Sequence, residues 1–296
     1  MLTGAGGYIG RPVCDELVAC GFEVHAVSRH DRNSKESTTW HAVDLLDSTA
    51  THALLANIRA THLMHLAWVT EPGTYWQSPD NGLWQDASIK LLKSFAAHGG
   101  ERAVLTGTCA EYDWTDGHCV EDKTPIRALS PYTTAKQAFH DAANALANTT
   151  NLSVAWARVF FSFGPNEHPQ RLVPAVIRAL LSGARAACSD GEQIRDFMYV
   201  QDMASALVAV LGSEFSGDIN IASGQPMTIK DLVTLVADKL DASDRVDFGK
   251  RPRQDGEPPR ITADVSRLRN TVGWTATHDI RSAIEQTIQF WKRSTK

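Results

Sequence analysis

Short apolar runs alternate with longer amphipathic segments over the first half of the chain. Four runs rich in valine, leucine, alanine and phenylalanine are predicted to be strands: residues 22–27, 63–67, 103–107 and 152–160. Apolar residues recur at spacings of three and four over residues 11–20, 48–59, 83–98 and 131–148, which predicts a helix in each segment. Strands that alternate with helices are typical of βαβ units with right-handed crossovers. The pattern therefore predicts an α/β fold with a doubly wound parallel sheet.

The pattern changes after Gly164-Pro165. Residues 166–169 are predicted to form a loop and residues 171–182 a helix, and the remainder mixes short strands, helices and proline-rich connections. We expect residues 1–164 to form the main domain, residues 191–222 to return to it, and residues 165–296 mainly to form a smaller C-terminal lobe.

Composition excludes several function classes. Hydrophobic residues make up 43% of the 296 residues and charged residues 21%, which are ordinary values for a folded globular protein. Because 29 lysines and arginines face 34 acidic residues, for a formal charge of −5, a nucleic-acid partner is not expected. The five cysteines are odd in number and lack paired spacing, and no apolar run is long enough to span a membrane, so we expect a cytoplasmic protein without a membrane partner. No ligand-like spacing predicts a metal site.

A glycine motif, TGAGGYIG, occupies residues 3–10, directly before the first predicted helix. Gly4, Gly7 and Gly10 would let backbone N–H groups approach a pyrophosphate, and the positive end of the following helix would stabilise its charge. The strand at 22–27 begins about a dozen residues later, where a dinucleotide-binding Rossmann fold places its second strand. A flexible glycine-rich N-terminus is the alternative. Only Met1, Leu2 and Thr3 precede the motif, so either the first strand is unusually short or the chain begins upstream.

The second predicted strand is followed by Ser28 and Arg29, with Arg32 close by. An acidic residue at the strand end would bind a ribose 2′-hydroxyl, whereas a hydroxyl and a guanidinium suit a 2′-phosphate. This predicts NADP as the preferred cofactor, with NAD as the alternative. Ser28 and Arg29 could instead simply begin a polar loop. Asp44 and Leu45, after the presumed third strand, could hold the adenine or form a surface turn.

A second motif, SPYTTAK at residues 130–136, places Tyr132 and Lys136 one turn apart on one face of a predicted helix. A tyrosine with a pKa of about 10 is a poor acid at neutral pH, but a neighbouring ammonium group favours the phenolate. Thr108 lies just past the strand at 103–107, at the sheet edge where ligands of such folds bind. The three side chains could pass a proton to or from an alcohol oxygen. The alternatives are a solvated helix face and a helix-capping threonine.

Together these motifs resemble those of the extended short-chain dehydrogenase/reductases, and among them the nucleotide-sugar epimerase/dehydratase/reductase group. The matching segments are TGAGGYIG at 3–10, HLA at 65–67, GTCAEY at 107–112, PYTTAK at 131–136, RVFFSFGP at 158–165, GEQIRDFMYVQD at 191–202, INIASG at 219–224 and DVSRLRNTVGW at 264–274. The resemblance implies that Thr108, Tyr132 and Lys136 are the catalytic residues.

The resemblance also implies binding residues. The implied cofactor contacts, beyond the glycines and the strand-end residues, are Tyr8, Ile9, Asp44, Leu45, Leu66, Ala67, Phe160 and Phe161. Arg195 and Arg253 would grip the diphosphate of a nucleotide-sugar substrate, although Arg253 could equally sit in a solvated loop. Members of the group commonly form homodimers through the helices at 83–98 and 131–148.

One departure from the family pattern narrows the activity. Sugar 4,6-dehydratases of the group follow the catalytic threonine with an Asp-Glu pair, but here Cys109 and Ala110 hold those places and Glu111 comes one position late. Dehydration is therefore not expected, and Glu111 is left as a candidate substrate contact. The layout is similar to that of 4-ketoreductases of the CDP-abequose synthase kind.

We therefore expect NADPH-dependent reduction of a nucleotide-linked 4-keto-deoxysugar, with Tyr132 as proton donor. A 4-epimerase with tightly bound NAD and a non-catalytic dinucleotide sensor are the alternatives. Five aromatic residues after strand ends could line the sugar site or pack in the core: Trp68, Tyr75, Trp76, Trp84 and Trp114.

Overall fold

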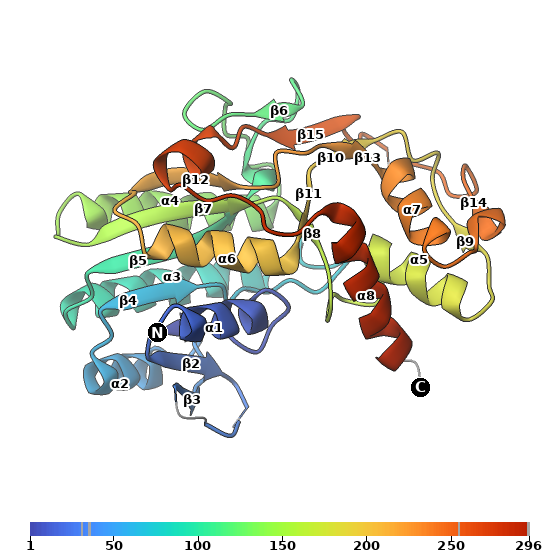
Figure 1. Cartoon of the computed structure of the whole chain (residues 1–296). Coiled ribbons are helices and arrows are strands. Elements are labelled where there is room, and N and C mark those ends of the chain that lie inside the picture. Colours follow the sequence, from blue (N-terminus) through green and yellow to red (C-terminus); the bar gives the residue numbers. More distant parts are fainter. Residues whose placement is uncertain (31, 35–36, 254, 295–296) are drawn as a thin grey trace.

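The computed structural model describes residues 1–30, 32–34, 37–253 and 255–294 (Figure 1). Its centre is a seven-stranded sheet in the order β12-β7-β5-β4-β1-β2-β3, and every neighbouring pair in it is parallel. The strands are β1 Leu2–Thr3, β2 Val24–Ser28, β3 Thr38–Ala42, β4 His62–His65, β5 Arg102–Thr108, β7 Ser153–Val159 and β12 Gly217–Ile221. The doubly wound α/β fold expected from the sequence is confirmed.

Helices cover both faces of this sheet because its central strands are apolar on both sides. Alternate strand residues point in opposite directions: Met64 and Val104 belong to one core cluster, and Leu63 and Leu105 to another. The first cluster is covered by α1 Gly10–Ala19 and α6 Val200–Leu211, in front of the sheet in Figure 1. The second is covered by α2 Ser48–Ile58, α3 Asp80–Ala97 and α4 Pro131–Ala147. The helices and strands expected in this part are present, with ends shifted by a few residues.

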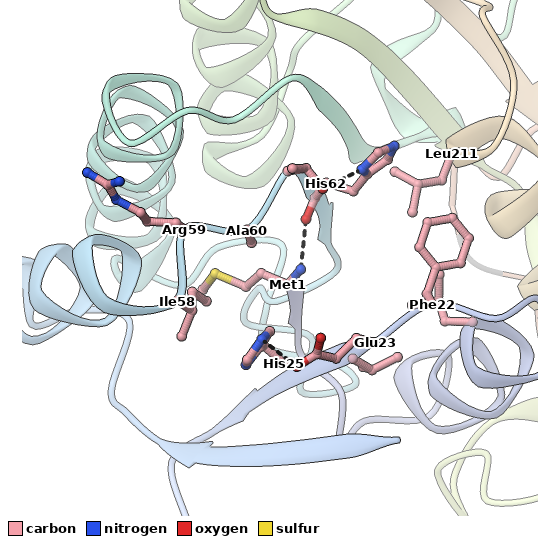
Figure 2. Close-up of a pocket in the computed structure, with 12 residues that line it drawn as sticks. Met1, Phe22, Glu23, His25, Ile58, Arg59, Ala60, His62 and Leu211 are labelled. Atoms are coloured by element: carbon pink, nitrogen blue, oxygen red, sulfur yellow. Dashed lines mark hydrogen bonds and ion pairs between the residues drawn. The ribbon is translucent and has the colours of Figure 1, made fainter. Parts of the chain in front are cut away.

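Strand β1 is short but central. Its two residues pair with β2 on one side and β4 on the other, with Leu2 opposite Ala26 and Met64. The amino group of Met1 donates to the carbonyl oxygen of His62 at 2.7 Å (Figure 2), and burial lowers the pKa of this amino group to about 5. The glycine motif therefore leaves the sheet directly at the carboxyl end of its central strand.

The second lobe lies at one end of the sheet and is built on α5, α7 and α8 (Figure 1). Its elements are β8 Phe161–Phe163, α5 Leu172–Leu181, β9 Ala186–Ala187, β10 Ile194–Arg195, β11 Phe197–Tyr199, β13 Met227–Thr228, α7 Ile229–Asp238, β14 Val246–Asp247, β15 Arg260–Ala263 and α8 Ile280–Ser294. A four-stranded sheet of order β13-β10-β15-β6 includes β6 His118–Cys119 from the first half of the chain. Between these segments, α6 and β12 rejoin the large sheet. Of the helices described, none has the length and apolar character needed to cross a bilayer.

Candidate active site

The glycine loop follows β1 at the carboxyl edge of the sheet. The Gly7 N–H donates to the Gly4 carbonyl at 2.9 Å, which closes the turn, and Gly4 adopts a φ of 67° that favours glycine. A Cβ on Gly4 would lie 2.9 Å from the Ala67 nitrogen, and a Cβ on Gly10 would lie 2.0 Å from the Gly4 oxygen. Glycine therefore lets α1 start tightly against β1, so its first N–H groups face the sheet edge where a pyrophosphate would bind.

The end of β2 faces this loop. The Ser28 hydroxyl donates to the His30 carbonyl, and Arg29 is exposed. The guanidinium of Arg32 lies closer to the glycine loop: a Cβ on Gly6 would be 2.9 Å from its Nη2 atom, and its Cζ is 5.1 Å from the centre of the Trp40 ring. Arg32 could not be preferred to Arg29 from the sequence, because its contact with Trp40 joins residues eight positions apart that show no local pattern.

Two further cofactor candidates lie at the neighbouring strand ends. The Leu66 and Ala67 N–H groups donate to the Thr3 hydroxyl at 3.2 and 3.4 Å, so this segment is fixed beside the glycine loop. After β3, the Asp44 carboxylate accepts from the Leu46 N–H at 3.0 Å and is exposed. Leu45, between them, is buried.

The crossing from β7 into the second lobe carries the remaining cofactor candidates. Phe160 is buried and its N–H donates to the Ile221 carbonyl at 3.1 Å. Phe161, Tyr8 and Ile9 pack against the apolar core of the second lobe. The glycine loop is therefore in contact with the lobe expected to hold the substrate.

The three catalytic candidates meet beside β5. The Ser130 hydroxyl accepts from the Thr133 N–H at 3.2 Å and starts α4, which puts Tyr132 and Lys136 on its buried face. Burial raises the pKa of the Tyr132 phenol well above its usual value, and a hydrogen bond with Thr108 opposes this shift only in part. Burial lowers the pKa of Lys136 to about 7. The hydroxyl, the phenol and the ammonium group thus form one buried cluster at the carboxyl end of a parallel strand.

Aromatic side chains enclose this cluster. The rings of Tyr75 and Trp76 meet that of Tyr132 edge to face, with centroids 4.9 and 5.6 Å away. The Tyr132 N–H also donates to the Trp76 carbonyl at 3.3 Å. Trp114 donates its indole N–H to the Cys109 carbonyl at 2.8 Å, next to Thr108. Most of the aromatic residues noted in the sequence therefore surround the cluster, and they would restrict the shape of a bound substrate.

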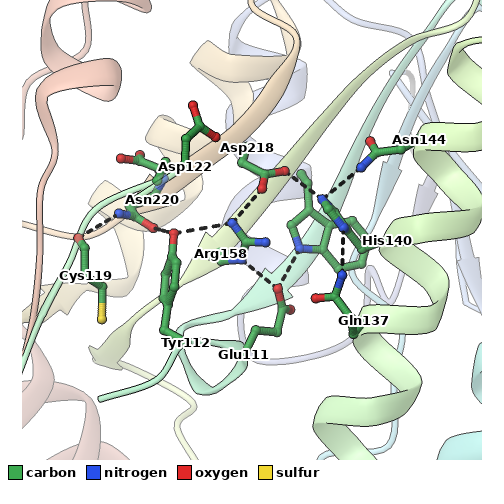
Figure 3. A network of polar contacts seen from close by, with 12 residues as sticks. Glu111, Tyr112, Cys119, Asp122, Gln137, His140, Asn144, Arg158, Asp218 and Asn220 are labelled. Atoms are coloured by element: carbon green, nitrogen blue, oxygen red, sulfur yellow. Dashed lines mark hydrogen bonds and ion pairs between the residues drawn. The ribbon is translucent and has the colours of Figure 1, made fainter. Parts of the chain in front are cut away.

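Glu111 is not positioned as expected. Its side chain is fully buried, with Oε1 accepting from the Thr108 N–H at 2.8 Å and Oε2 from the Trp156 indole at 3.0 Å and the Arg158 Nε at 2.7 Å (Figure 3). Both oxygens are occupied inside the protein, so this placement does not fit the expected substrate contact. The reason is the 3-10 turn Cys109–Glu111, which points the carboxylate back beneath β5.

A network of charges continues behind Glu111. The guanidinium of Arg158 donates to Asp218 at 2.8 Å, and the other oxygen of Asp218 pairs with His140 on α4 at 2.8 Å (Figure 3). The Tyr112 hydroxyl donates to Asn220 at 2.8 Å. The network ties the catalytic turn to β7, β12 and α4. Its clearest sign in the sequence is Arg158, the one charged residue of β7.

The proposed diphosphate ligands lie on the second lobe. Arg195 is buried, donates to Glu257 at 2.8 Å, and holds its Cζ 5.6 Å from the centre of the Phe161 ring. Arg253 is half-exposed and donates to Asp190 at 2.7 Å. Burial lowers the pKa of Arg195, and the charge of Arg253 contributes to this, so the two guanidinium groups lie in one neighbourhood. The carboxylate partner Glu257 was not identified from the sequence.

A hollow of about 230 Å³ lies elsewhere, at the amino ends of β2 and β4 (Figure 2). It is lined by residues that include Met1, His25, Arg59 and His62, and by none of the glycine-loop or catalytic candidates. Because ligands of open α/β sheets bind at the carboxyl ends of the strands, this hollow is not the candidate active site.

Comparisons with known proteins agree with this geometry. The NAD dependent epimerase/dehydratase family matches residues 1–222. UDP-glucuronic acid decarboxylase 1 of Xenopus tropicalis is 24% identical over 99% of this chain and 72% of its own length, and UDP-glucose 4-epimerase of Mycolicibacterium smegmatis is 24% identical over 100% and 99%. A structure of MoeE5 in complex with UDP-glucuronic acid and NAD is 29% identical, with a TM-score of 0.86 over 99% of this chain and 98% of that chain.

The fold alone is shared with more distant structures. UDP-glucose 4-epimerase of Thermotoga maritima has a TM-score of 0.86 at 19% identity, over 100% of this chain and 99% of that one. The match to the family model covers most of this chain, including the glycine loop, Thr108, Tyr132 and Lys136. The chain therefore belongs to the NAD dependent epimerase/dehydratase family, and it is an enzyme of the extended short-chain dehydrogenase/reductase type.

Proposed function

We propose that this enzyme reduces a nucleotide-linked 4-keto-deoxysugar at C4, with NADPH as the reductant. The observation that carries the proposal is the end of β2, which pairs with β1: it carries Ser28 and the exposed Arg29, and the Arg32 guanidinium that follows lies near the glycine loop. Hydroxyl and guanidinium groups suit a 2′-phosphate, and a carboxylate suits a free ribose 2′-hydroxyl. A bound cofactor of this kind supplies the hydride when reduced.

The residues present fit a dinucleotide. Gly4, Gly7 and Gly10 carry no side chain that would keep a pyrophosphate from the backbone at the amino end of α1. Leu66 and Ala67 lie beside this loop and would also contact the cofactor. Other proposed contacts are Tyr8, Ile9, Asp44, Leu45, Phe160 and Phe161. We propose that residues 1–164 and 191–222 form the cofactor-binding part and that the rest of 165–296 binds the sugar nucleotide.

In this proposal Tyr132 is the acid. As the hydride adds to C4 of the sugar, the electrons of the carbonyl double bond move to O4, which takes the phenolic proton of Tyr132. The raised pKa of Tyr132 keeps that proton in place beforehand, and the hydroxyl of Thr108 can hydrogen-bond O4. The ammonium group of Lys136 stabilises the phenolate that remains, and the phenolate then regains a proton from water.

The neighbours of Thr108 support reduction rather than dehydration. Elimination of water needs a group that removes a carbon-bound proton. Burial raises the pKa of the Cys109 thiol well above its usual value, Ala110 carries no acid, and Glu111 is paired with Arg158. Reduction of a ketone needs only the hydride and one proton, which Tyr132 can supply.

Arg195 and Arg253 are proposed to bind the diphosphate. Two guanidinium groups suit a diphosphate, because each planar guanidinium can donate two hydrogen bonds to phosphate oxygens. A diphosphate would take the place of Glu257 as the partner of Arg195.

A homodimer through α3 and α4 is also proposed. Leu83 on α3 is 56% exposed, and such an interface would cover it.

A 4-epimerase that retains NAD is the second candidate. A relative named UDP-glucose 4-epimerase aligns over 100% of this chain. A retained NAD would accept and return the hydride, and Tyr132 would act first as base and then as acid on the same sugar. Denaturing the pure protein distinguishes the two functions. An epimerase that keeps NAD bound would release one NAD per chain, and a reductase would not.

The test is turnover. The purified enzyme is given NADPH and 4-keto-deoxysugars linked to UDP, dTDP, CDP or GDP, and loss of NADPH absorbance is followed. We expect one nucleotide series to be reduced, and Tyr132→Phe to lose at least about a hundredfold in rate while its thermal shift with NADPH matches the wild type. Equal rates for Tyr132→Phe and wild type would overturn the assignment of the acid. No turnover with any of the four series would overturn the proposed reaction.

A further inference from the structure

Few hydrogen bonds or charges stabilise the ammonium group of Lys136. Lys136 is 3% exposed, and its Nζ donates to the Thr106 carbonyl at 2.8 Å. The carboxylate that favours its charged form, Glu111, is itself paired with Arg158 at 2.7 Å. Burying an ammonium group is costly unless something compensates for the lost water. The charge of Lys136 therefore needs a further partner.

Trp68 supplies a second contact. The Nζ of Lys136 lies 3.9 Å from the centre of the Trp68 ring, within the range of a cation–π interaction. The ring is held in this orientation from two sides. Its indole N–H donates to the buried Asn81 at 2.9 Å, and it stacks on Phe139 with centroids 6.4 Å apart and planes 24° apart. The face of the indole is thus fixed against the ammonium group before any ligand binds.

We propose that Trp68 is a positioning residue that keeps Lys136 charged and in place beside Tyr132. The inference rests on the proposed function, in which Lys136 stabilises the Tyr132 phenolate. An aromatic face suits this task better than a carboxylate would. Tryptophan is the strongest cation–π partner among the side chains, and it carries no net charge that would cancel the field of the ammonium group at Tyr132.

Of the groups near Lys136, one titrates in the same range. Burial lowers the pKa of His140, one turn further along α4, but its hydrogen bond with Asp218 and the charge of that carboxylate outweigh burial and raise the pKa above the usual value. His65 on β4 is buried, and burial and the charge of Lys136 lower its pKa to about 3, so it is neutral. The pKa values of Tyr132, on the same helix, and of Cys109, after β5, are raised by burial well above neutral. Glu111 faces Lys136 from the turn after β5 and is held by Arg158. The titration must therefore follow a resonance of Lys136 itself, separately from that of His140.

The test is a direct titration of Lys136 in the whole chain. The protein is labelled with carbon-13 at lysine Cε, Lys136→Met assigns the resonance, and NMR follows it against pH. We expect Trp68→Leu to lower the pKa of Lys136 by about one unit or more, and Trp68→Phe to lower it by less, because phenylalanine keeps a weaker aromatic face. Trp84→Leu is the matched control: Trp84 packs on Trp68, with centroids 6.5 Å apart, and should leave the pKa unchanged.

An unchanged or raised pKa in Trp68→Leu would overturn the proposal, since a purely structural role would admit water and raise it. If Trp68→Leu does not fold, a downward shift in Trp68→Phe supports the proposal and no shift overturns it. In the turnover assay the alkaline limb of the rate should move down by the same amount. The titration needs no substrate, so a Lys136 shift without turnover in any variant would refute the proposed reaction and leave the role of Trp68 standing.

Discussion

Replacing Glu111 by Gln would remove one charge from the buried network of Figure 3 and keep the size of the side chain. The remaining amide oxygen can still accept from the Thr108 N–H, which is 2.8 Å from Oε1. The new amide NH₂ would face two donors, the Trp156 indole and the Arg158 Nε, which now donate to Oε2 at 3.0 and 2.7 Å. Both donors would lose their acceptor inside the protein.

The size of the loss in stability depends on the ion pair that Arg158 retains. Removing one partner of a buried ion pair costs about 3–5 kcal/mol, because the other charge stays buried without compensation. Here Arg158 retains Asp218 at 2.8 Å, so its charge is not left alone and the lower end of the range applies. We expect Glu111→Gln to lower the free energy of unfolding by about 3 kcal/mol, which is roughly a hundredfold in the ratio of folded to unfolded protein.

Urea unfolding followed by circular dichroism measures this change. Glu101→Gln is the matched control, since Glu101 is exposed just before β5 and its replacement should change the free energy of unfolding by less than about 0.5 kcal/mol. A loss below about 1 kcal/mol for Glu111→Gln, at an unchanged dependence on urea, would refute the reasoning that this carboxylate is a buried, paired charge.

Three further predictions address the cofactor and the response to pH. Arg29→Ala should weaken NADPH binding about tenfold more than NADH binding in fluorescence titrations, because a charge-assisted hydrogen bond to phosphate is lost; equal losses would remove the phosphate role. Gly10→Ala should abolish the thermal shift with NADPH, since its Cβ would lie 2.0 Å from the Gly4 oxygen, and a normal shift would contradict the tight turn. Burial raises the pKa of Glu167 to about 8, above its unfolded value of about 4.5, so the folded state should lose about 3–4 kcal/mol of stability as pH rises from 5 to 8. Glu167→Gln should remove this loss of stability. If the variant unfolds with the same pH dependence as wild type, Glu167 is not its cause.

The first half of the fold was predictable because its signals are local. The apolar run at 152–160 became β7 Ser153–Val159, and the helical spacing at 131–148 became α4 Pro131–Ala147. The second lobe was predicted only in outline. Its strands β10 and β15 have two and four residues, too few for an alternating pattern, and they pair across a long stretch of sequence.

The candidate site divides in the same way. Tyr132 and Lys136 could be proposed from the sequence because their spacing on one helix is a local property. Thr108 could be proposed because its place at the end of a strand is local too. Glu111 was assigned to the substrate because its distance from Thr108 along the chain does not tell which way the turn points it. The contact between Trp68 and Lys136 joins two distant segments, and no periodicity encodes it.

The most direct measurement is the fate of deuterium from NADPH labelled at the nicotinamide C4. With a nucleotide-linked 4-keto-deoxysugar, the account predicts a product that carries one deuterium at sugar C4, with one NADP⁺ formed per product, and no such product from Tyr132→Phe. Interconversion of two 4-epimeric nucleotide sugars by the enzyme as purified, with no deuterium taken from added NADPH, would contradict it.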